Sequence, residues 1–213
     1  MDKLGIKATL YDFFGYLVPG LVLLLYAYVF YQNICQELNF IVILQSLAKY
    51  NKAIYSILVI LIGYCLGHII SSVSYFVIEN SIFRNIVFLK SKLELKEVVS
   101  LELYNSFQGE YRRYFNVDYN SKDIRTLICY VEKNNPEIYS TAFVFLAIYG
   151  MARNLSMISF IFAIAEIGCF IYSNSILICI YILCGLSFGL VFFYEYFRFK
   201  KYFLQQILNG LLM

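Results

Sequence analysis

The sequence contains no tryptophan, two prolines and one histidine, and charged residues make up only 15% of its 213 positions. A soluble domain carries about 25% charged residues, so this chain is poor in the groups that keep a protein surface hydrated. Its 17 basic and 14 acidic residues leave a net charge of +3, which provides no strongly basic face of the kind that binds nucleic acid. The composition therefore argues against a soluble domain and against a nucleic-acid-binding protein.

The motifs of the common enzyme classes are also missing. The chain has no GxSxG, HExxH, Walker A or GxGxxG pattern, and its six cysteines include no CxxC pair. A lone histidine and scattered cysteines indicate neither a zinc site nor a disulfide framework. We therefore expect a protein that is not an enzyme and that needs neither a metal nor another cofactor.

Long apolar segments are what the sequence has in quantity, and hydrophobic residues make up 61% of it. No charged residue occurs from Phe13 to Gln36, from Ala53 to Ile78 or from Ile167 to Tyr194. A helix of about 20 apolar residues crosses the hydrocarbon core of a bilayer, and each of these runs is long enough. The sequence therefore predicts an all-α integral membrane protein, which we expect to have four transmembrane helices.

A region of balanced charge separates the spans into two hairpins. Between positions 79 and 140 the chain carries nine basic and nine acidic residues, interleaved with apolar residues at helical spacing. In chain order we expect a first hairpin (1–79, with spans at about 13–31 and 54–78), a cytosolic helical region (80–153) and a second hairpin (154–213, with spans at about 154–172 and 175–194).

The third span is expected within a much longer helix. Asn135–Glu137 combines a capping residue, a proline at the first helical position and an acid in the first turn, which is typical of a helix start. Nothing breaks the helix until about Asn174, so its roughly 57 Å exceed the thickness of a bilayer. We place the crossing at 154–172, with Arg153 at the inner interface; the alternative, 141–165, would bury Arg153 in the membrane.

The placement of basic residues predicts the orientation. The N-terminal residues, the region 80–153 and the segment after Tyr194 all carry lysine or arginine, whereas the predicted loop 172–175 carries none. Both termini and the middle region are therefore expected in the cytosol. The tail, 196–213, is predicted to be an amphipathic helix that lies on the inner leaflet or docks on a partner.

Small residues four apart occur in two of the spans. Gly63 and Gly67 form one GxxxG motif, and Gly185 and Gly189 form another. Such glycines lie on one face of a helix and let a second helix approach closely. The two motifs predict close helix packing, either within one subunit or between subunits.

Pro19 and Gly20 fall inside the first span. Proline removes one backbone hydrogen bond and glycine adds conformational freedom, so the pair predicts a kink near this end of the helix.

Three ionisable residues fall in or beside the spans and are candidates for lining or gating a pore. His68 could line a pore, relay protons or sense pH, or it could be a neutral histidine bonded to a neighbouring helix. Glu166 could favour cations, or it could be protonated or paired with His68. Arg153 is expected to anchor its helix by extending its side chain to the inner interface, with gating or partner contact as the alternative.

Arg112 and Arg113 lie between Tyr111 and Tyr114 in the predicted cytosolic region. Arginine beside tyrosine suits contact with phosphate or with a stacked base in a partner or ligand. The balanced charge around them also fits an ordinary solvated helix face, and both interpretations stay open.

The order of these features resembles that of small multi-pass membrane proteins of bacterial antiviral defence. The resemblance rests on Tyr11–Gly20 (YDFFGYLVPG), on the cytosolic helical insert, on Tyr149–Leu155 (YGMARNL) and on Tyr194–Tyr202 (YEYFRFKKY). The chain is similar in this layout to accessory proteins encoded beside RNA-targeting CRISPR nucleases and to membrane effectors of nucleotide-signalling defence systems. The resemblance implies an oligomer in the bacterial inner membrane that permeabilises or depolarises it when triggered, although no defined ligand-binding domain is evident.

We therefore expect an oligomeric channel-like effector, whose partners are the lipid bilayer, further copies of the chain, and a cytosolic protein or nucleotide signal. The alternative is a non-catalytic scaffold or accessory subunit that recruits a cytosolic partner. A small transporter would need a dimer and shows no inverted repeat, and a membrane-embedded enzyme is the remaining possibility.

Overall fold

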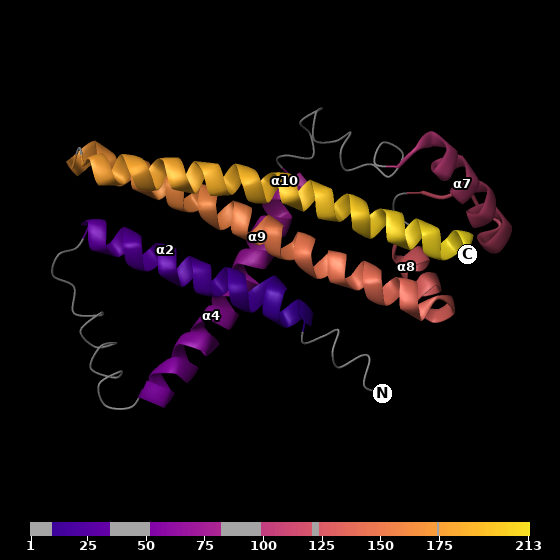
Figure 1. The fold of residues 1–213 in the computed structure, drawn as a ribbon, viewed down its shortest axis with the longest axis horizontal. Coiled ribbons are helices and arrows are strands. Elements are labelled where there is room, and N and C mark those ends of the chain that lie inside the picture. Colours follow the sequence, from indigo (N-terminus) through magenta and orange to yellow (C-terminus); the bar gives the residue numbers. More distant parts are fainter. Residues whose placement is uncertain (1–9, 35–51, 82–98, 121–123, 174) are drawn as a thin grey trace. The chain divides into compact units, whose positions relative to one another are not determined.

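The computed structural model describes residues 10–34, 52–81, 99–120, 124–173 and 175–213, and every regular element in these ranges is helical (Figure 1). The elements η1 and η2 are π-helical and the others are α-helices. In chain order the elements are η1 (Asp12–Leu17), α2 (Val18–Ile34), α4 (Lys52–Ser74), η2 (Tyr75–Ser81), α7 (Leu101–Phe115), α8 (Ile124–Asn134), α9 (Pro136–Ser173) and α10 (Ile176–Leu212).

Four helical stretches are long and apolar enough to cross a membrane. They are Asp12–Asn33, Lys52–Glu79, Pro136–Ile171 and Ile176–Leu212. Each overlaps one of the predicted spans, so the prediction of an all-α membrane protein with four transmembrane helices is confirmed. The apolar segments are helical because a helix satisfies all of its backbone hydrogen bonds without water.

The described chain divides into two compact units. Unit 1 consists of Met1–Tyr11, Tyr75–Tyr149 and Glu195–Met213, and unit 2 consists of Asp12–Ser74 and Gly150–Tyr194. Two long, continuous helices, α9 and α10, contribute to both units (Figure 1). The charged middle region thus shares one unit with the two ends of the chain.

In unit 2, glycines bring the first two spans together. A Cβ atom added at Gly20 would collide with the backbone of Gly63, and one added at Gly67 would collide with the backbone of Tyr16. At these points the helices meet backbone against backbone, which only glycine permits. Gly20, expected to help kink the first span, therefore serves a close approach, and the helix continues through Pro19 as α2.

The second glycine pair packs α10 against α9 in the same unit. A Cβ at Gly185 would lie 3.1 Å from the Cβ of Ala163, and one at Gly189 would lie 2.7 Å from the Phe160 ring. The Ser156 hydroxyl donates a hydrogen bond of 3.0 Å to the Gly189 carbonyl. Glycines of both GxxxG motifs thus lie at helix contacts within one chain.

Unit 1 holds the amphipathic helices α7 and α8. The Ser100 side chain caps α7 by accepting a hydrogen bond from the backbone amide of Leu103, and Asn116 ends the helix in the left-handed conformation, at φ 57°. The apolar faces of the two helices contribute Phe107, Tyr111 and other residues to one core. The buried members of that core are Val99, Phe107, Tyr111, Leu127, Val131, Ala142, Phe203, Leu204, Ile207, Leu208 and Leu211.

The C-terminal tail belongs to this core, which corrects its expected placement on the inner leaflet. It is the continuation of α10, and five of the buried core residues lie between Phe203 and Leu211. Its apolar face packs against α7, α8 and the first turns of α9, which removes apolar surface of all four segments from water. The Asn135 amide also donates a hydrogen bond of 2.5 Å to the Gly210 carbonyl, which ties the tail to the start of α9.

The start of α9 at Pro136 is the predicted one. The Asn135 carbonyl accepts the first helical hydrogen bond from the Tyr139 amide at 3.0 Å. Proline suits this position because its missing N–H would have no partner in the first turn.

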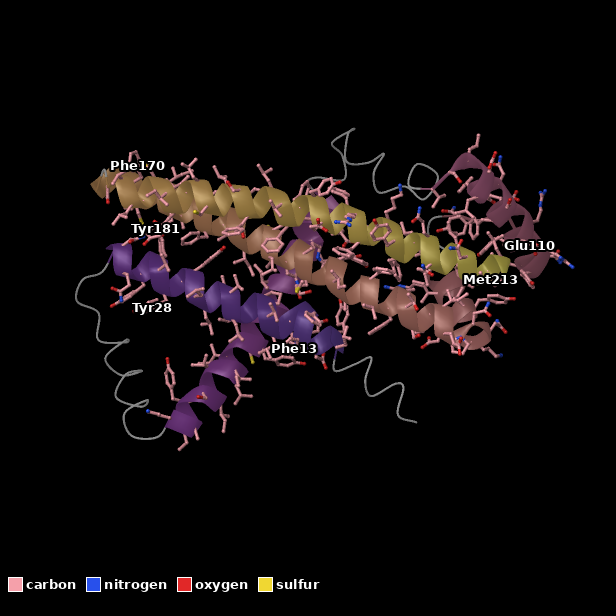
Figure 2. The ribbon with its side chains drawn as sticks, viewed as in Figure 1. Phe13, Tyr28, Glu110, Phe170, Tyr181 and Met213 are labelled. Atoms are coloured by element: carbon pink, nitrogen blue, oxygen red, sulfur yellow. The ribbon has the colours of Figure 1, made fainter. Side chains whose placement is uncertain are left out.

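Side chains cover every described helix of unit 2, and many of the large apolar ones face outward. Phe13 and Tyr28, labelled in Figure 2, are each half exposed. The exposed residues of α4 include Ile57, Leu61 and Ile69. An apolar outer surface of this kind fits a unit surrounded by lipid.

Candidate functional site

A buried polar cluster joins α9 to the first two spans inside unit 2. Its members are Gly15 in η1, Ser71 and Ser74 in α4, and Arg153 and Asn154 in α9, and all five are buried. Buried polar groups are costly in an apolar surrounding unless they bond to one another. Apolar packing alone does not explain why these polar groups are buried here, so the cluster is a candidate functional site.

Asn154 bonds both to the backbone of η1 and to a side chain of α4. Its side-chain amide donates to the carbonyl of Gly15 at 2.8 Å. The Asn154 carbonyl oxygen in turn accepts a short hydrogen bond from the Ser74 hydroxyl. One amide side chain thus links three spans.

Arg153 points into the same cluster, which corrects the expectation that it reaches to the inner interface. Its side chain is 6% exposed. Its Nε donates to the Ser74 hydroxyl at 3.1 Å, and one terminal nitrogen donates to the Ser71 hydroxyl at 3.2 Å. Serine hydroxyls on the facing side of α4 supply acceptors, so the guanidinium bonds within the protein.

Glu166 forms a second polar contact further along α9. It is fully buried, and the Asn33 side-chain amide donates to both of its carboxylate oxygens, at 3.0 Å and 2.9 Å. By helical rise it lies about 20 Å from Arg153. Its hydrogen-bond partner is therefore Asn33 at the end of α2, and not His68, which we had considered as an alternative.

His68 lies on α4 with its ring held by aromatic side chains. It stacks on Tyr16, with ring centroids 3.7 Å apart and planes 22° apart, and the Tyr64 ring meets it edge-on at 4.7 Å. The residue is nevertheless exposed. The three predicted pore or gating residues thus have different described partners: His68 contacts Tyr16 and Tyr64, Arg153 bonds to Ser71 and Ser74, and Glu166 bonds to Asn33.

Arg112 and Arg113 lie at the end of α7 in unit 1 and form surface ion pairs. Arg112 pairs with Asp118 at 3.3 Å, and both side chains are about 70% exposed. Arg113 pairs with Glu110 at 3.5 Å, and Glu110 is labelled in Figure 2. This arrangement matches a solvated helix face and leaves both guanidinium groups accessible to a partner.

Two residues of these contacts were missed in the sequence. Asn33 and Asn154 carry no charge, and yet Asn33 donates both hydrogen bonds to Glu166, and Asn154 donates to the Gly15 carbonyl and accepts from Ser74. The signal that could have revealed them is an amide side chain within or beside a predicted span, because such a group must find a partner there.

The fold and these contacts define an all-α membrane protein with polar contacts buried among its spans. Comparison with protein families, with curated protein sequences and with solved structures gives no match. Among the described residues, no group of three or more histidine, cysteine, aspartate or glutamate side chains is arranged to hold a metal ion. The function is therefore inferred from the geometry of the chain itself.

Proposed function

We propose that this chain is an oligomeric, channel-like effector that depolarises the bacterial inner membrane, in antiviral defence. The observation that carries the proposal is Glu166, a fully buried carboxylate in the long apolar helix α9, held by Asn33. An ionisable side chain within a span is costly, and such residues commonly mark a path for ions or protons.

Arg153 supports the proposal because it is a second buried ionisable group on the same helix. Its hydrogen bonds to Ser71 and Ser74 hold α9 against α4, and Asn154 adds the bond to η1. In the proposed mechanism Glu166 attracts cations, and the Arg153 cluster keeps the three helices in one arrangement. A trigger that breaks the cluster changes that arrangement and opens the path.

An oligomer is part of the proposal because four spans are too few to enclose a water-filled pore. The trigger acts on unit 1, where a cytosolic protein or a nucleotide signal binds near Arg112 and Arg113. Residues of α9 and α10 belong to both units, so these two helices are the proposed route from the trigger to the spans. The distribution of basic residues supports an orientation with both termini in the cytosol.

Membrane potential tests this function directly. Bacteria that express the full chain from an inducible promoter are loaded with a voltage-sensitive dye, beside cells expressing Glu166→Gln and Glu137→Gln variants at equal membrane levels. Glutamine at 166 keeps the shape and one of the two hydrogen bonds from Asn33 but carries no charge. We expect the parent chain and the control, Glu137→Gln at an exposed position of α9, to depolarise the cells, and Glu166→Gln to do so much less.

The channel is refuted if triggered cells that contain the protein in their membranes keep their potential, whereas equal depolarisation by all three chains would show that the Glu166 charge is not needed. Purified protein in liposomes loaded with a potassium-sensitive dye gives the same comparison without other cellular proteins. Flux that is equal in the parent chain and Glu166→Gln would exclude Glu166 from the path.

A scaffold is the second candidate, and a specific observation favours it. Unit 1 has its own core of buried aromatic and aliphatic residues, so its surface can change without disturbing that core. The exposed Arg112 and Arg113 would then bind a cytosolic partner. Charge reversal at both positions should abolish recovery of that partner with the membrane fraction and leave the membrane potential unchanged, whereas unchanged recovery would reject this role.

A further inference from the structure

The outward face of α4 carries a line of polar side chains in an otherwise apolar surface. Leu61, Cys65, His68 and Ser72 are spaced by four, three and four residues, which places them on one side of the helix, and all four are exposed. Their exposed neighbours on α4 include Ile57, Ile62 and Ile69. We call Cys65, His68 and Ser72 the polar stripe of α4.

The imidazole of His68 is fixed but incompletely bonded. Tyr16 covers one face of the ring at 3.7 Å, and Tyr64 meets it edge-on. Within the described part of the chain, neither ring nitrogen has a hydrogen-bond partner, although a neutral imidazole offers one donor and one acceptor. Hydrocarbon supplies neither, so the ring nitrogens require a polar partner outside unit 2.

Ser72 has a matching capacity. Its hydroxyl donates to the carbonyl of His68 at 3.1 Å, so its proton is used within the helix and its oxygen can still accept a hydrogen bond. An imidazole N–H from a second molecule can meet that oxygen. The stripe therefore presents both a donor and an acceptor within one turn of helix.

We propose that the polar stripe of α4 is the contact between two copies of this chain, related by a two-fold axis. A two-fold contact places the same surface on both sides, so His68 of each copy meets Ser72 or His68 of the other. Cys65 and Ser72 are small, and the spacing of four and three residues is that of helices that pack with a left-handed crossing. The side of α4 that carries Gly63 and Gly67 packs against α2 and η1, so the outward side is open to a second copy.

The inference rests on the oligomer of the proposed function and adds the surface on which it assembles. Disulfide crosslinking through Cys65 tests it in native membranes of the expressing cells. The test chain keeps Cys65 and has alanine at the other five cysteine positions; the control chain keeps only Cys184, which is exposed on α10. Copper phenanthroline catalyses the oxidation of two thiols to one disulfide. Dioxygen takes up the two electrons, and two protons are released.

We expect a crosslinked dimer from the Cys65 chain and roughly tenfold less from the Cys184 chain. Random collision in the membrane affects both thiols similarly, so the excess at Cys65 measures the proposed contact. In the Cys65 chain, His68→Leu should lower the dimer yield roughly fivefold, because leucine packs but makes no hydrogen bond. His68→Gln should keep most of the yield, since glutamine both donates and accepts. Circular dichroism of each variant in detergent confirms that it remains helical.

Equal crosslinking of the two cysteines, or no effect of His68→Leu, would overturn the inference. A folded Cys65 chain that gives no dimer would also overturn the inference. This holds if maleimide labels Cys65 freely, and it also holds if another protein shields Cys65 from maleimide. The outcome is separate from the channel test. Crosslinking without depolarisation would retain the interface and reject the channel, and depolarisation without crosslinking would do the reverse.

Discussion

The two units of this chain differ in the side chains that they bury. Unit 1 buries large residues, and Phe107, Tyr111 and Leu208 are at most 2% exposed. Unit 2 turns many of its large residues outward, and Ile69 and Ile164 are more than half exposed. Beside some apolar residues, unit 2 buries several glycines and a set of polar groups.

The difference is the one that physical chemistry expects between a unit in water and a unit in lipid. In water, apolar side chains gain free energy by leaving the surface, so a small unit is stabilised by the aromatic core it can bury. In lipid the surroundings are as apolar as leucine, and helices associate through close backbone packing and hydrogen bonds between spans. The same chemical change should therefore have different effects in the two units.

The largest difference is expected from truncating a phenylalanine in each unit. Phe107→Ala in unit 1 removes a fully buried ring whose centroid lies 5.0 Å from that of Tyr119. The substitution should lower the free energy of unfolding by about 3–5 kcal/mol. Phe13→Ala in unit 2 removes a half-exposed ring and should cost less than about 1 kcal/mol. Unfolding of the full chain in mixed micelles by increasing SDS measures both. Equal losses would show that the two units do not differ in this way.

A glycine comparison follows within unit 2. Gly67→Ala places a Cβ against the backbone of Tyr16, which cannot give way as a side chain would, and should cost about 3 kcal/mol. Gly168→Ala is the matched control, because no atom lies within 4 Å of the added Cβ. Alanine there should be neutral or slightly stabilising, since it favours the helix. A Gly67→Ala chain as stable as the parent would mean that α4 and η1 are not in close contact.

The buried polar contacts of unit 2 should have the next largest effect. Asn154→Ala leaves the Gly15 carbonyl without its side-chain donor and removes the acceptor used by Ser74, at a cost of about 2 kcal/mol. Asn134→Ala is its control, because Asn134 is exposed and donates only to the carbonyl of Tyr130 on its own helix. Thermal unfolding followed by circular dichroism compares the two. Identical midpoints would remove the polar cluster from the forces that hold unit 2.

The four spans and the start of α9 were predictable because they depend on local patterns. Apolar length defines a span, and Asn135–Glu137 carries its own start signal. The partners of Arg153 and Glu166 were not predictable, since Ser74 and Asn33 are more than 70 residues away in the chain. A single sequence contains no signal for which distant amide or hydroxyl a buried charge will bond.

The tail shows the same limit from another side. Its amphipathic pattern correctly marks one apolar face, but the pattern is equally compatible with a lipid leaflet, a partner and the chain's own helices. The structure selects the third, because α7 and α8 present apolar faces to it. Patterning therefore predicts that a face is buried, and packing decides against what.

The smallest effect is expected on the surface of unit 1. Arg112 and Asp118 are each about 70% exposed, so their ion pair is screened by water and Arg112→Ala should change the free energy of unfolding by about 0.5 kcal/mol or less. Chemical unfolding of the full chain, beside Phe107→Ala, measures the change on the same unit. A loss above about 2 kcal/mol would mean that the pair supports the core, since exposed pairs do not reach that value. A loss within the expected range makes Arg112 free to serve a partner, because charge reversal there would then affect binding without affecting the fold.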